Sequence, residues 1–406
     1  MKTSRSTLFI VSLLGALSVI SPFAIDMYLP AFGMVAADFD VPSTTISLTL
    51  SSYFIGLALG QIFYGPLLDR FGRKKPLYAG LALFVAASVG CAFAPNIYAL
   101  IALRFLQALG GCVAQVASIA MVRDFFPAKE SARILSLLFL FIALSPLLAP
   151  TTGGLLALWL GWRTVFLLMA AIVAVILAAV YTLLPEGHTP DRSISLRAGP
   201  ICREYLTILR HPKFITYALS GAFSFAGLFT YVAGSPIIFM EGFGLSGHMY
   251  SAIFAGLAVG FIGGSQLNVA LLRRYESEVL FLRVLVLQAA TGTLFTLGAW
   301  AGLWGLAETL VLFFLFLSCV GLTYPNAAAL ALSPFSRNAG SASALLGFLQ
   351  LGVGSLISTG ISLTPPENSF PIIAICGVTS LMGLCILLAG RSRAEASGNL
   401  ATAQSL

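Results

Sequence analysis

Charge is the scarcest property of this 406-residue sequence, in which Asp, Glu, Lys and Arg together make up 9% of the residues. Soluble domains carry about 25% charged residues, so a water-soluble fold is excluded. Only three histidines occur, and we expect all of them in loops: His188, His211 and His248. Without a nucleophile paired to a base, or a glycine-rich phosphate-binding loop, the sequence predicts neither an enzyme nor direct use of ATP.

Cysteine gives no chemical signal either. Five of the six cysteines lie in apolar runs, and Cys202 lies in an expected loop, so helix packing explains them. No spacing typical of a metal site is present. We therefore expect no metal ion and no organic cofactor.

Apolar residues are abundant instead: they form 58% of the chain, and the mean hydropathy is +0.96. A helix needs about 20 residues to cross the ~30 Å hydrocarbon core of a bilayer. Twelve apolar runs are near or above that length, so the sequence predicts an all-α membrane protein with twelve transmembrane helices in a lipid bilayer. We expect these helices near 8–32, 43–66, 76–94, 97–121, 134–158, 164–184, 214–238, 249–271, 279–300, 304–332, 341–363 and 370–390.

The positive charges indicate how these helices are threaded. If the first residue is cytoplasmic and twelve helices alternate, all 22 Lys and Arg lie in or beside inner loops and tails except Arg104, Arg163 and Arg283. This bias follows the positive-inside rule and places both termini in the cytoplasm, as expected in a bacterial inner membrane. Topology thus explains the net charge of +7, and no nucleic-acid partner is expected. Lys2 and Arg5 precede an apolar run as in a signal peptide, but without a small-x-small site we expect no cleavage.

A long polar stretch divides the chain into two halves. It runs from Pro185 to Pro212 and contains an amphipathic segment, 201–209, that we expect along the cytoplasmic membrane surface. We predict an N-terminal six-helix bundle at 1–184, a linker at 185–212, a C-terminal six-helix bundle at 213–390 and a tail at 391–406. Similar segments at 67–71 (LLDRF) and 271–275 (LLRRY) indicate that the two bundles are related.

Five charges are concentrated between the second and third apolar runs, in the stretch Gly65-Pro66-Leu67-Leu68-Asp69-Arg70-Phe71-Gly72-Arg73-Lys74-Lys75. We predict a shaped, packed turn here. The stretch resembles the loop 2–3 signature of the major facilitator superfamily of transporters. That resemblance implies two pseudo-symmetric six-helix bundles with a substrate site between them at the membrane midplane.

We predict that this turn is part of a conformational latch. Asp69 would contact Arg73 and the positive end of the helix that begins near Ser341, and Asp124 would offer a second acceptor. A simple topology anchor is the alternative. The predicted latch residues are Gly65, Asp69, Arg70, Gly72, Arg73 and Asp124.

Two charged residues lie within predicted helices of the first half. An acid such as Asp26 costs at least ~2.5 kcal/mol near the centre of a membrane helix. Desolvation favours its neutral form and a nearby cation its ionised form, so it is suited to bind and release a proton. Arg104 stays charged and needs a partner or a cavity. Both lie at comparable depth, so we expect Asp26 and Arg104 to interact and to couple protons; a structural ion pair, or a helix-end position for Asp26, is the alternative.

The resemblance extends along the first half. Arg104-xx-Gln107-xx-Gly110 resembles the helix 4 signature of facilitator antiporters, whose Arg is implicated in proton coupling. Helix 5 matches the antiporter pattern G-xxx-G-P-xx-G-G, with Ser and Ala at the first two glycines: Ser145, Ala149, Pro150, Gly153 and Gly154. Further matches at 25–31, 122–124 and 161–163 resemble the bicyclomycin/chloramphenicol resistance (Bcr/CflA) subfamily.

Small residues recur every four positions on three helices, and we predict that these rows lie where the two bundles slide against each other. Polar and aromatic residues on the helices expected to line the cavity are candidate substrate contacts. For both sets, ordinary helix packing is the alternative. The rows are Ser52, Gly56 and Gly60; Ser145, Ala149 and Gly153; and Ala252, Gly256, Gly260 and Gly264. The candidate contacts are Tyr28, Gln115, Ser224, Tyr231, Tyr324 and Asn326.

Together these features predict a monomeric, proton-driven exporter of small amphiphilic, neutral or weakly charged molecules. Export of an endogenous metabolite or siderophore, proton symport, and a non-transporting receptor are the alternatives. The antiport mode comes from the resemblance of helix 5. The sequence does not identify the compound.

Overall fold

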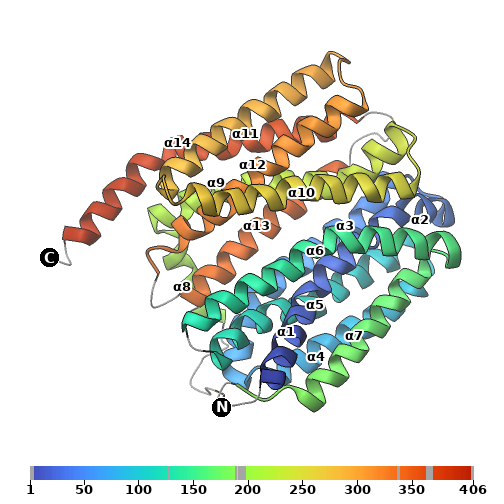
Figure 1. The fold of residues 1–406 in the computed structure, drawn as a ribbon, viewed down its shortest axis with the longest axis horizontal. Coiled ribbons are helices and arrows are strands. Elements are labelled where there is room, and N and C mark those ends of the chain that lie inside the picture. Colours follow the sequence, from blue (N-terminus) through green and yellow to red (C-terminus); the bar gives the residue numbers. More distant parts are fainter. Residues whose placement is uncertain are drawn as a thin grey trace. The chain divides into compact units, whose positions relative to one another are not determined.

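The structure is a computed structural model that describes residues 4–126, 128–187, 190, 198–335, 339–362 and 369–403. No strand occurs among these residues, which form a series of helices (Figure 1). In chain order they are α1 (Ser4–Asp26), η1 (Leu29–Ala31), α2 (Phe32–Phe39), α3 (Ser43–Phe71), α4 (Lys74–Ala92), α5 (Ile97–Phe125), α6 (Ala128–Leu160), α7 (Arg163–Leu183), α8 (Ala198–Leu209), α9 (Pro212–Pro236), η2 (Ile237–Gly242), α10 (Gly247–Leu271), α11 (Ser277–Trp300), α12 (Leu306–Leu332), α13 (Ala339–Ser362) and α14 (Phe370–Ala403).

The prediction of an all-helical membrane protein is confirmed. Among the described residues, eleven helices are long and apolar enough to cross a bilayer, and the shorter apolar stretch Leu144–Leu160 lies within α6. These twelve segments coincide with the twelve predicted spans, and most ends differ by only a few residues. The agreement reflects a simple constraint, because a helix satisfies all its backbone hydrogen bonds internally and is therefore stable in lipid.

The first span differs from the prediction of one continuous helix at 8–32. The α-helix ends at Asp26, a short 3₁₀ turn follows at Leu29–Ala31, and α2 then continues the apolar segment to Phe39. Pro30 lies in the 3₁₀ turn, where its missing N–H and fixed φ interrupt a regular α-helix. The carboxylate at Asp26 is thus placed at a helix end beside an irregular backbone.

The charged turn between α3 and α4 is shorter than predicted. α3 continues through Gly65 and Pro66 to Phe71, so only Gly72 and Arg73 connect it to α4. Gly72 has φ +82° and ψ 169°, a backbone region that is essentially restricted to glycine and strains other residues by roughly 1–3 kcal/mol. A Cβ at Gly65 would meet no atom within 4 Å, so the shape of the turn depends on only one of the two glycines.

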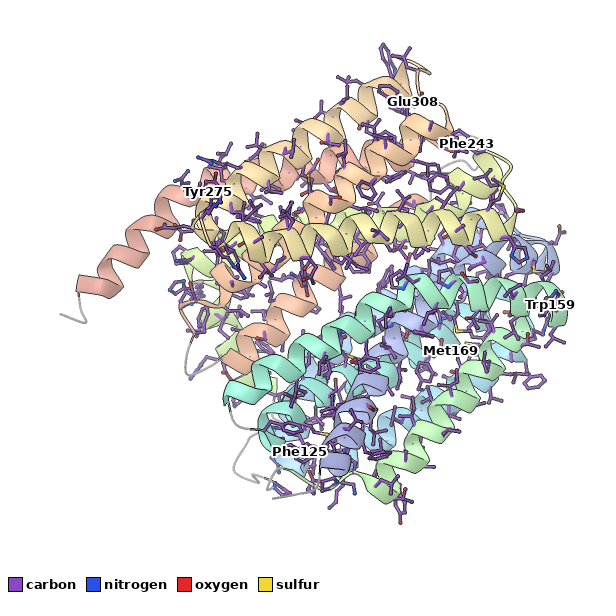
Figure 2. The ribbon with its side chains drawn as sticks, in the orientation of Figure 1. Phe125, Trp159, Met169, Phe243, Tyr275 and Glu308 are labelled. Atoms are coloured by element: carbon purple, nitrogen blue, oxygen red, sulfur yellow. The ribbon has the colours of Figure 1, made fainter. Side chains whose placement is uncertain are left out.

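Contacts divide the chain into two compact units. The first comprises Met1–Arg197 and Gly247–Ala252, and the second comprises Ala198–Ser246 and Ile253–Leu406. The first boundary falls within the segment 185–212 that was predicted to be the linker. Figure 2 places Phe125 and Trp159 at opposite ends of the first unit, and Tyr275, just before α11, and Glu308, in the first turn of α12, at opposite ends of the second.

The rows of small residues pack inside the units. Ser52 donates to the carbonyl of Ile101, and a Cβ at Gly56 would lie 2.6 Å from the carbonyl oxygen of Phe105, so this row of α3 faces α5. In α10, a Cβ at Gly260 would lie 2.9 Å from the carbonyl oxygen of Phe314 in α12. The prediction that these rows lie between sliding bundles is therefore wrong for α3 and for this part of α10. Close approach of neighbouring helix backbones within one bundle explains the small side chains.

Candidate functional site

Arg104 lies in the interior of the first unit. The side chain of Asn96 accepts the N–H of Ala99 and caps the start of α5, which places Arg104 two turns into the helix. The arginine is completely buried. Its Nη1 donates to Gln107 Oε1 at 2.5 Å and to the carbonyl of Ala24 in α1 at 3.2 Å.

Aromatic rings surround the remaining guanidinium surface. The guanidinium carbon lies 4.2 Å from the ring centre of Tyr53, 5.0 Å from that of Tyr28 and 5.7 Å from that of Phe166. The Nε and Nη2 groups of Arg104 make no hydrogen bond within the part of the chain that the structure describes, so the faces of these rings are the main stabilising groups for the charge. Cation–π contacts of desolvated groups contribute about 2 kcal/mol or more. Arg104 is thus a buried cation in an aromatic cage.

Asp26 is held by another helix. It is only 6% exposed, and its Oδ2 accepts a hydrogen bond of 2.9 Å from the hydroxyl of Ser145 in α6. The predicted contact between Asp26 and Arg104 is wrong, because no ion pair or hydrogen bond joins these two described residues. The guanidinium binds the α1 carbonyl of Ala24 instead, two residues before the acid.

The helix 5 motif explains why α6 approaches α1 so closely. A Cβ at Gly153 would collide with the carbonyl of Met27, and Ala149 is completely buried. Ser145, one turn before Ala149, therefore faces α1 and reaches Asp26. Gly154 lies on a neighbouring face, where a Cβ would come within 3.4 Å of Pro30, while Pro150 lies within the helix. The motif joins α6 to α1, and the small row of α6 is not a sliding surface at these positions.

A second charged group lies at the turn between α3 and α4. Arg73 donates from Nη1 to Asp69 Oδ1 at 2.6 Å and from Nε to Asp124 Oδ2 at 2.8 Å. These three residues form the turn cluster. The side chain of Arg73 is 9% exposed, against 46% for Asp69. Burial lowers the pKa of the Arg73 guanidinium, but Asp124 and then Asp69 outweigh that effect and raise it above its usual value. The two predicted carboxylate contacts of Arg73 are confirmed.

Sequence reasoning missed a further acid beside the turn cluster, Glu186. Its carboxylate accepts the backbone N–H groups of Arg73 at 2.9 Å and Lys74 at 3.2 Å, and it therefore caps the start of α4. Gly72 is packed against the same carboxylate. A carboxylate at a helix N-terminus is favoured by the helix dipole. The sequence did contain a sign of this contact, because Pro185-Glu186-Gly187 directly follows an apolar span. The acid is therefore expected on the cytoplasmic side, where the basic turn was also predicted.

Arg70 and Gly65 take less part in the turn cluster. The guanidinium carbon of Arg70 lies 5.8 Å from the ring centre of Phe71, and Gly65 lies within α3. The predicted contact of Asp69 with the helix that begins near Ser341 stays a prediction.

Four of the six candidate substrate contacts are buried in helix packing. Tyr28 accepts a hydrogen bond from Thr49, Ser224 bonds with Gln288 and Thr323, and the ring of Tyr231 stacks on Phe254 at 5.2 Å. Asn326 is also buried, as described next. Gln115 and Tyr324 are half-buried, and Tyr324 lies 4.5 Å from the ring of Phe225, so these two remain the better candidates.

Asn326 belongs to a neutral junction in the second unit. Its Nδ2 donates to Asn268 Oδ1 of α10 at 2.6 Å, and its Oδ1 accepts the hydroxyl of Ser277 in α11 at 2.6 Å. We call these three residues the amide cluster. They join the end of α10, the start of α11 and the body of α12, and sequence reasoning missed the role of Asn268 and Ser277.

The chain is similar in sequence to known membrane transporters. Residues 14–359 match the sequence profile of the Major Facilitator Superfamily. The chain is 32% identical to the "Uncharacterized MFS-type transporter YdgK" of Bacillus subtilis (strain 168), over 94% of this chain and 95% of that protein. It is 29% identical to the "Bicyclomycin resistance protein homolog" of Haemophilus influenzae, over 96% of both chains.

A further relative and a solved structure agree with this assignment. The chain is 28% identical to the "Chloramphenicol resistance protein" of Pseudomonas aeruginosa, over 97% of this chain and 94% of that one. The crystal structure of a D-xylose-proton symporter is 17% identical, covers 93% of this chain and 97% of its own, and superposes with a TM-score of 0.71. At that identity the likeness concerns the fold, which the two proteins share.

Proposed function

This chain belongs to the Major Facilitator Superfamily, and on that premise we propose that it is a proton-driven exporter of small amphiphilic molecules. Superfamily membership makes it a membrane transporter and not an enzyme. Relatives named for resistance to bicyclomycin and chloramphenicol favour antibiotics of that size and the Bcr/CflA group.

The observation that carries the proposal is the environment of Asp26. The carboxylate is buried within a membrane-spanning segment, and no cation lies within ion-pair distance among the described residues. An ionised carboxylate without a cationic partner is costly in such surroundings, and binding a proton removes that cost. When the transporter opens Asp26 to water, the ionised form is stabilised again and the proton leaves. Alternating access thereby becomes coupled to protonation.

Arg104 has a different role in this proposal. It is held by Gln107, the Ala24 carbonyl and the aromatic cage, so it does not neutralise Asp26 directly. Its bond to α1 places a permanent positive charge two residues from the acid along the chain. We propose that this charge favours the ionised state of Asp26, most strongly while water is still excluded, since interactions between charges act at longer range in a low-dielectric interior.

The setting of the transporter follows from the charge pattern. We propose a bacterial inner membrane with both termini in the cytoplasm, supported by the positive residues of predicted inner loops. The chain would act as a monomer whose partners are the substrate, protons and lipid. The predicted bundles at 1–184 and 213–390, the linker at 185–212 and the tail at 391–406 remain part of this proposal.

Two experiments test the function. First, a susceptibility panel that includes bicyclomycin and chloramphenicol is measured in a bacterial strain lacking its own efflux pumps, with the wild-type chain, Asp26→Asn and Asp40→Asn. Asp40 ends α2 with φ +52°, where Asn fits well, so this variant is a matched control. We expect resistance with the wild type and the control and its loss with Asp26→Asn. Unchanged susceptibility to every compound would exclude drug export and favour an endogenous metabolite or siderophore.

Second, inside-out vesicles separate antiport from symport. With an acidic interior, an antiporter accumulates labelled chloramphenicol as protons leave, whereas a symporter expels it. We expect accumulation by the wild type and none by Asp26→Asn, while exchange of labelled for unlabelled compound without a gradient persists in both. Gradient-driven accumulation by Asp26→Asn at the wild-type level would refute the proposed role of this acid.

A further inference from the structure

The hydroxyl of Ser145 is directed at the acid of another helix. Serine in a helix often donates to a carbonyl of its own preceding turn, as Ser88 does to Phe84 and Ser18 to Gly15. Ser145 is completely buried and instead donates to Asp26 Oδ2 across the α1–α6 contact. Glycine, which the antiporter pattern has at this position, has no such donor. The substitution therefore adds a polar contact at the proposed proton site.

We propose that Ser145 is a positioning residue that fixes the orientation of the Asp26 carboxylate and sets the pH range over which it exchanges its proton. This inference rests on the proposed function. It concerns this chain in particular, because the hydroxyl depends on the serine that replaces the glycine of the motif.

The surroundings make this hydrogen bond the main polar contact of the acid. α1 packs against α5, α6, α7 and η1. From α5, Arg104 reaches the carbonyl of Ala24 and not the carboxylate. From α7, Arg163 pairs with Asp38 at 2.8 Å. The hydroxyl of Tyr28, which precedes η1, accepts from Thr49. The segment Leu144–Leu160 of α6 contains no charged residue, and Lys129, Glu130 and Arg133 lie about three turns or more before Ser145.

The packing of α6 holds the hydroxyl in place. One turn beyond Ser145, Ala149 is completely buried, and Gly153 is in contact with the backbone of Met27. The backbone of α6 is therefore held where the Ser145 hydroxyl can reach Asp26, and a movement of α6 relative to α1 would separate the two groups. Such a movement would remove the donor and change the proton affinity of the acid, which links the position of a helix to the binding of a proton.

The direction of the effect follows from hydrogen-bond chemistry. A hydroxyl can donate to an ionised carboxylate and accept from a protonated one, so the contact persists in both states. The bond to the charged form is about twice as strong. Ser145 thus favours the ionised acid, and its removal moves protonation to higher pH.

The test measures the protonation of Asp26 without a substrate. Infrared difference spectra of the reconstituted full chain are recorded across pH. The carboxylic acid band that is absent from Asp26→Asn is assigned to Asp26, and the pH at which this band reaches half its intensity is its midpoint. We expect its midpoint to rise by about one pH unit in Ser145→Ala, from the usual strength of a hydrogen bond to a charged group. Ser145→Thr retains the hydroxyl and should keep the wild-type midpoint. Ser18→Ala, in which a buried serine of the same helix as Asp26 loses an intrahelical bond, is the matched control.

The outcomes separate the two proposals. A midpoint in Ser145→Ala equal to that of the wild type overturns the positioning role; if Ser145→Ala does not fold, Ser145→Gly replaces it. A higher midpoint of the Asp26 band in Ser145→Ala or Ser145→Gly, but not in Ser145→Thr, supports the role. The pH profile of chloramphenicol accumulation should then move in the same direction. If the band shifts as expected but no pH gradient drives accumulation, the proposed function fails while the positioning of Asp26 stands.

Discussion

The turn cluster of the first unit and the amide cluster of the second stabilise comparable junctions with different chemistry. Each joins three successive helices that are second, third and fourth among the spans of their unit: α3, α4 and α5, or α10, α11 and α12. In the first, Arg73 bridges two carboxylates. In the second, Asn326 bridges an amide and a hydroxyl with no charge. Three helices can therefore be joined without ions.

This difference indicates what the charges of the turn cluster add. A buried ion pair often contributes little to stability compared with apolar packing, because desolvation offsets the attraction. Neutral hydrogen bonds achieve the same connection in the second unit. Charges, in contrast, can be exchanged between partners when helices move. We infer that the turn cluster is retained for the transport cycle and the amide cluster for structure.

The largest expected effect comes from breaking the turn cluster. Asp124→Ala leaves the buried Arg73 with one of its two carboxylates. We expect a loss of about 3 kcal/mol in the free energy of unfolding, at the low end of the ~3–5 kcal/mol for broken buried pairs. The measurement is the apparent unfolding temperature in detergent. The double variant Arg73→Met/Asp124→Leu should recover that temperature and still fail to transport. Wild-type transport by the double variant would show that the charges have only a structural role.

Breaking the amide cluster should lower stability but, unlike breaking the turn cluster, should leave transport unaffected. Asn326→Ala leaves Asn268 and Ser277 without their shared partner, and we expect a loss of roughly 1–3 kcal/mol. Transport per folded molecule should remain unchanged, as measured by uptake normalised to the folded fraction. A matched pair, Asn268→Leu/Asn326→Leu, should be closer to the wild type in stability. A fall in transport per folded molecule would instead favour the earlier prediction that Asn326 contacts the substrate.

A smaller effect distinguishes the two glycines of the charged turn. Gly72→Ala should cost roughly 1–2 kcal/mol, within the range expected for a side chain forced into this glycine-only backbone region, and its Cβ would also press against Glu186. Gly65→Ala, in a helix and with free space around its Cβ, should leave stability unchanged or raise it by about 0.5–1 kcal/mol. Unfolding temperatures of the two variants test this. Equal losses would mean that both glycines shape the junction.

The smallest expected effect concerns the cap of α4. Glu186→Gln removes the charge that complements the helix dipole, so the amides of Arg73 and Lys74 should exchange hydrogen about two- to fivefold faster, as measured by mass spectrometry. Glu276→Gln is the matched control, since Glu276 precedes α11 and its side chain does not cap that helix. Unchanged exchange in Glu186→Gln would mean that the backbone alone stabilises the start of α4.

The sequence predicted most of the fold because the membrane leaves few choices. Apolar runs became helices with nearly the predicted ends, since backbone groups in lipid must be satisfied within a helix. The contact of Arg73 with Asp69 was also predictable, because residues four apart along a helical turn are neighbours. Pro30 signalled the break in the first span, but its consequence, a helix end at Asp26, was considered only as the alternative.

The site was harder to predict because residue type does not say which neighbour a side chain faces. Asp26 and Arg104 lie at similar depth, yet Arg104 is stabilised by aromatic rings and Asp26 by a serine. Similarly, Tyr231 and Ser224 have the polarity of cavity residues but pack between helices. Polarity and spacing identify a helix face; only the arrangement of the neighbouring helices shows what that face contacts.

The aromatic cage of Arg104 has a consequence for the electric field inside the first unit. Because rings carry no net charge, this arginine keeps a full positive charge, and Asp26, the acid of α1, lies two residues after the Ala24 carbonyl that Arg104 binds. Two unit charges 10 Å apart interact by about 1.7 kcal/mol at an effective dielectric constant of 20. In the proposed cycle, protonation of Asp26 would leave the charge of Arg104 without this compensation, and a cationic compound would be repelled in that state while a neutral one would not.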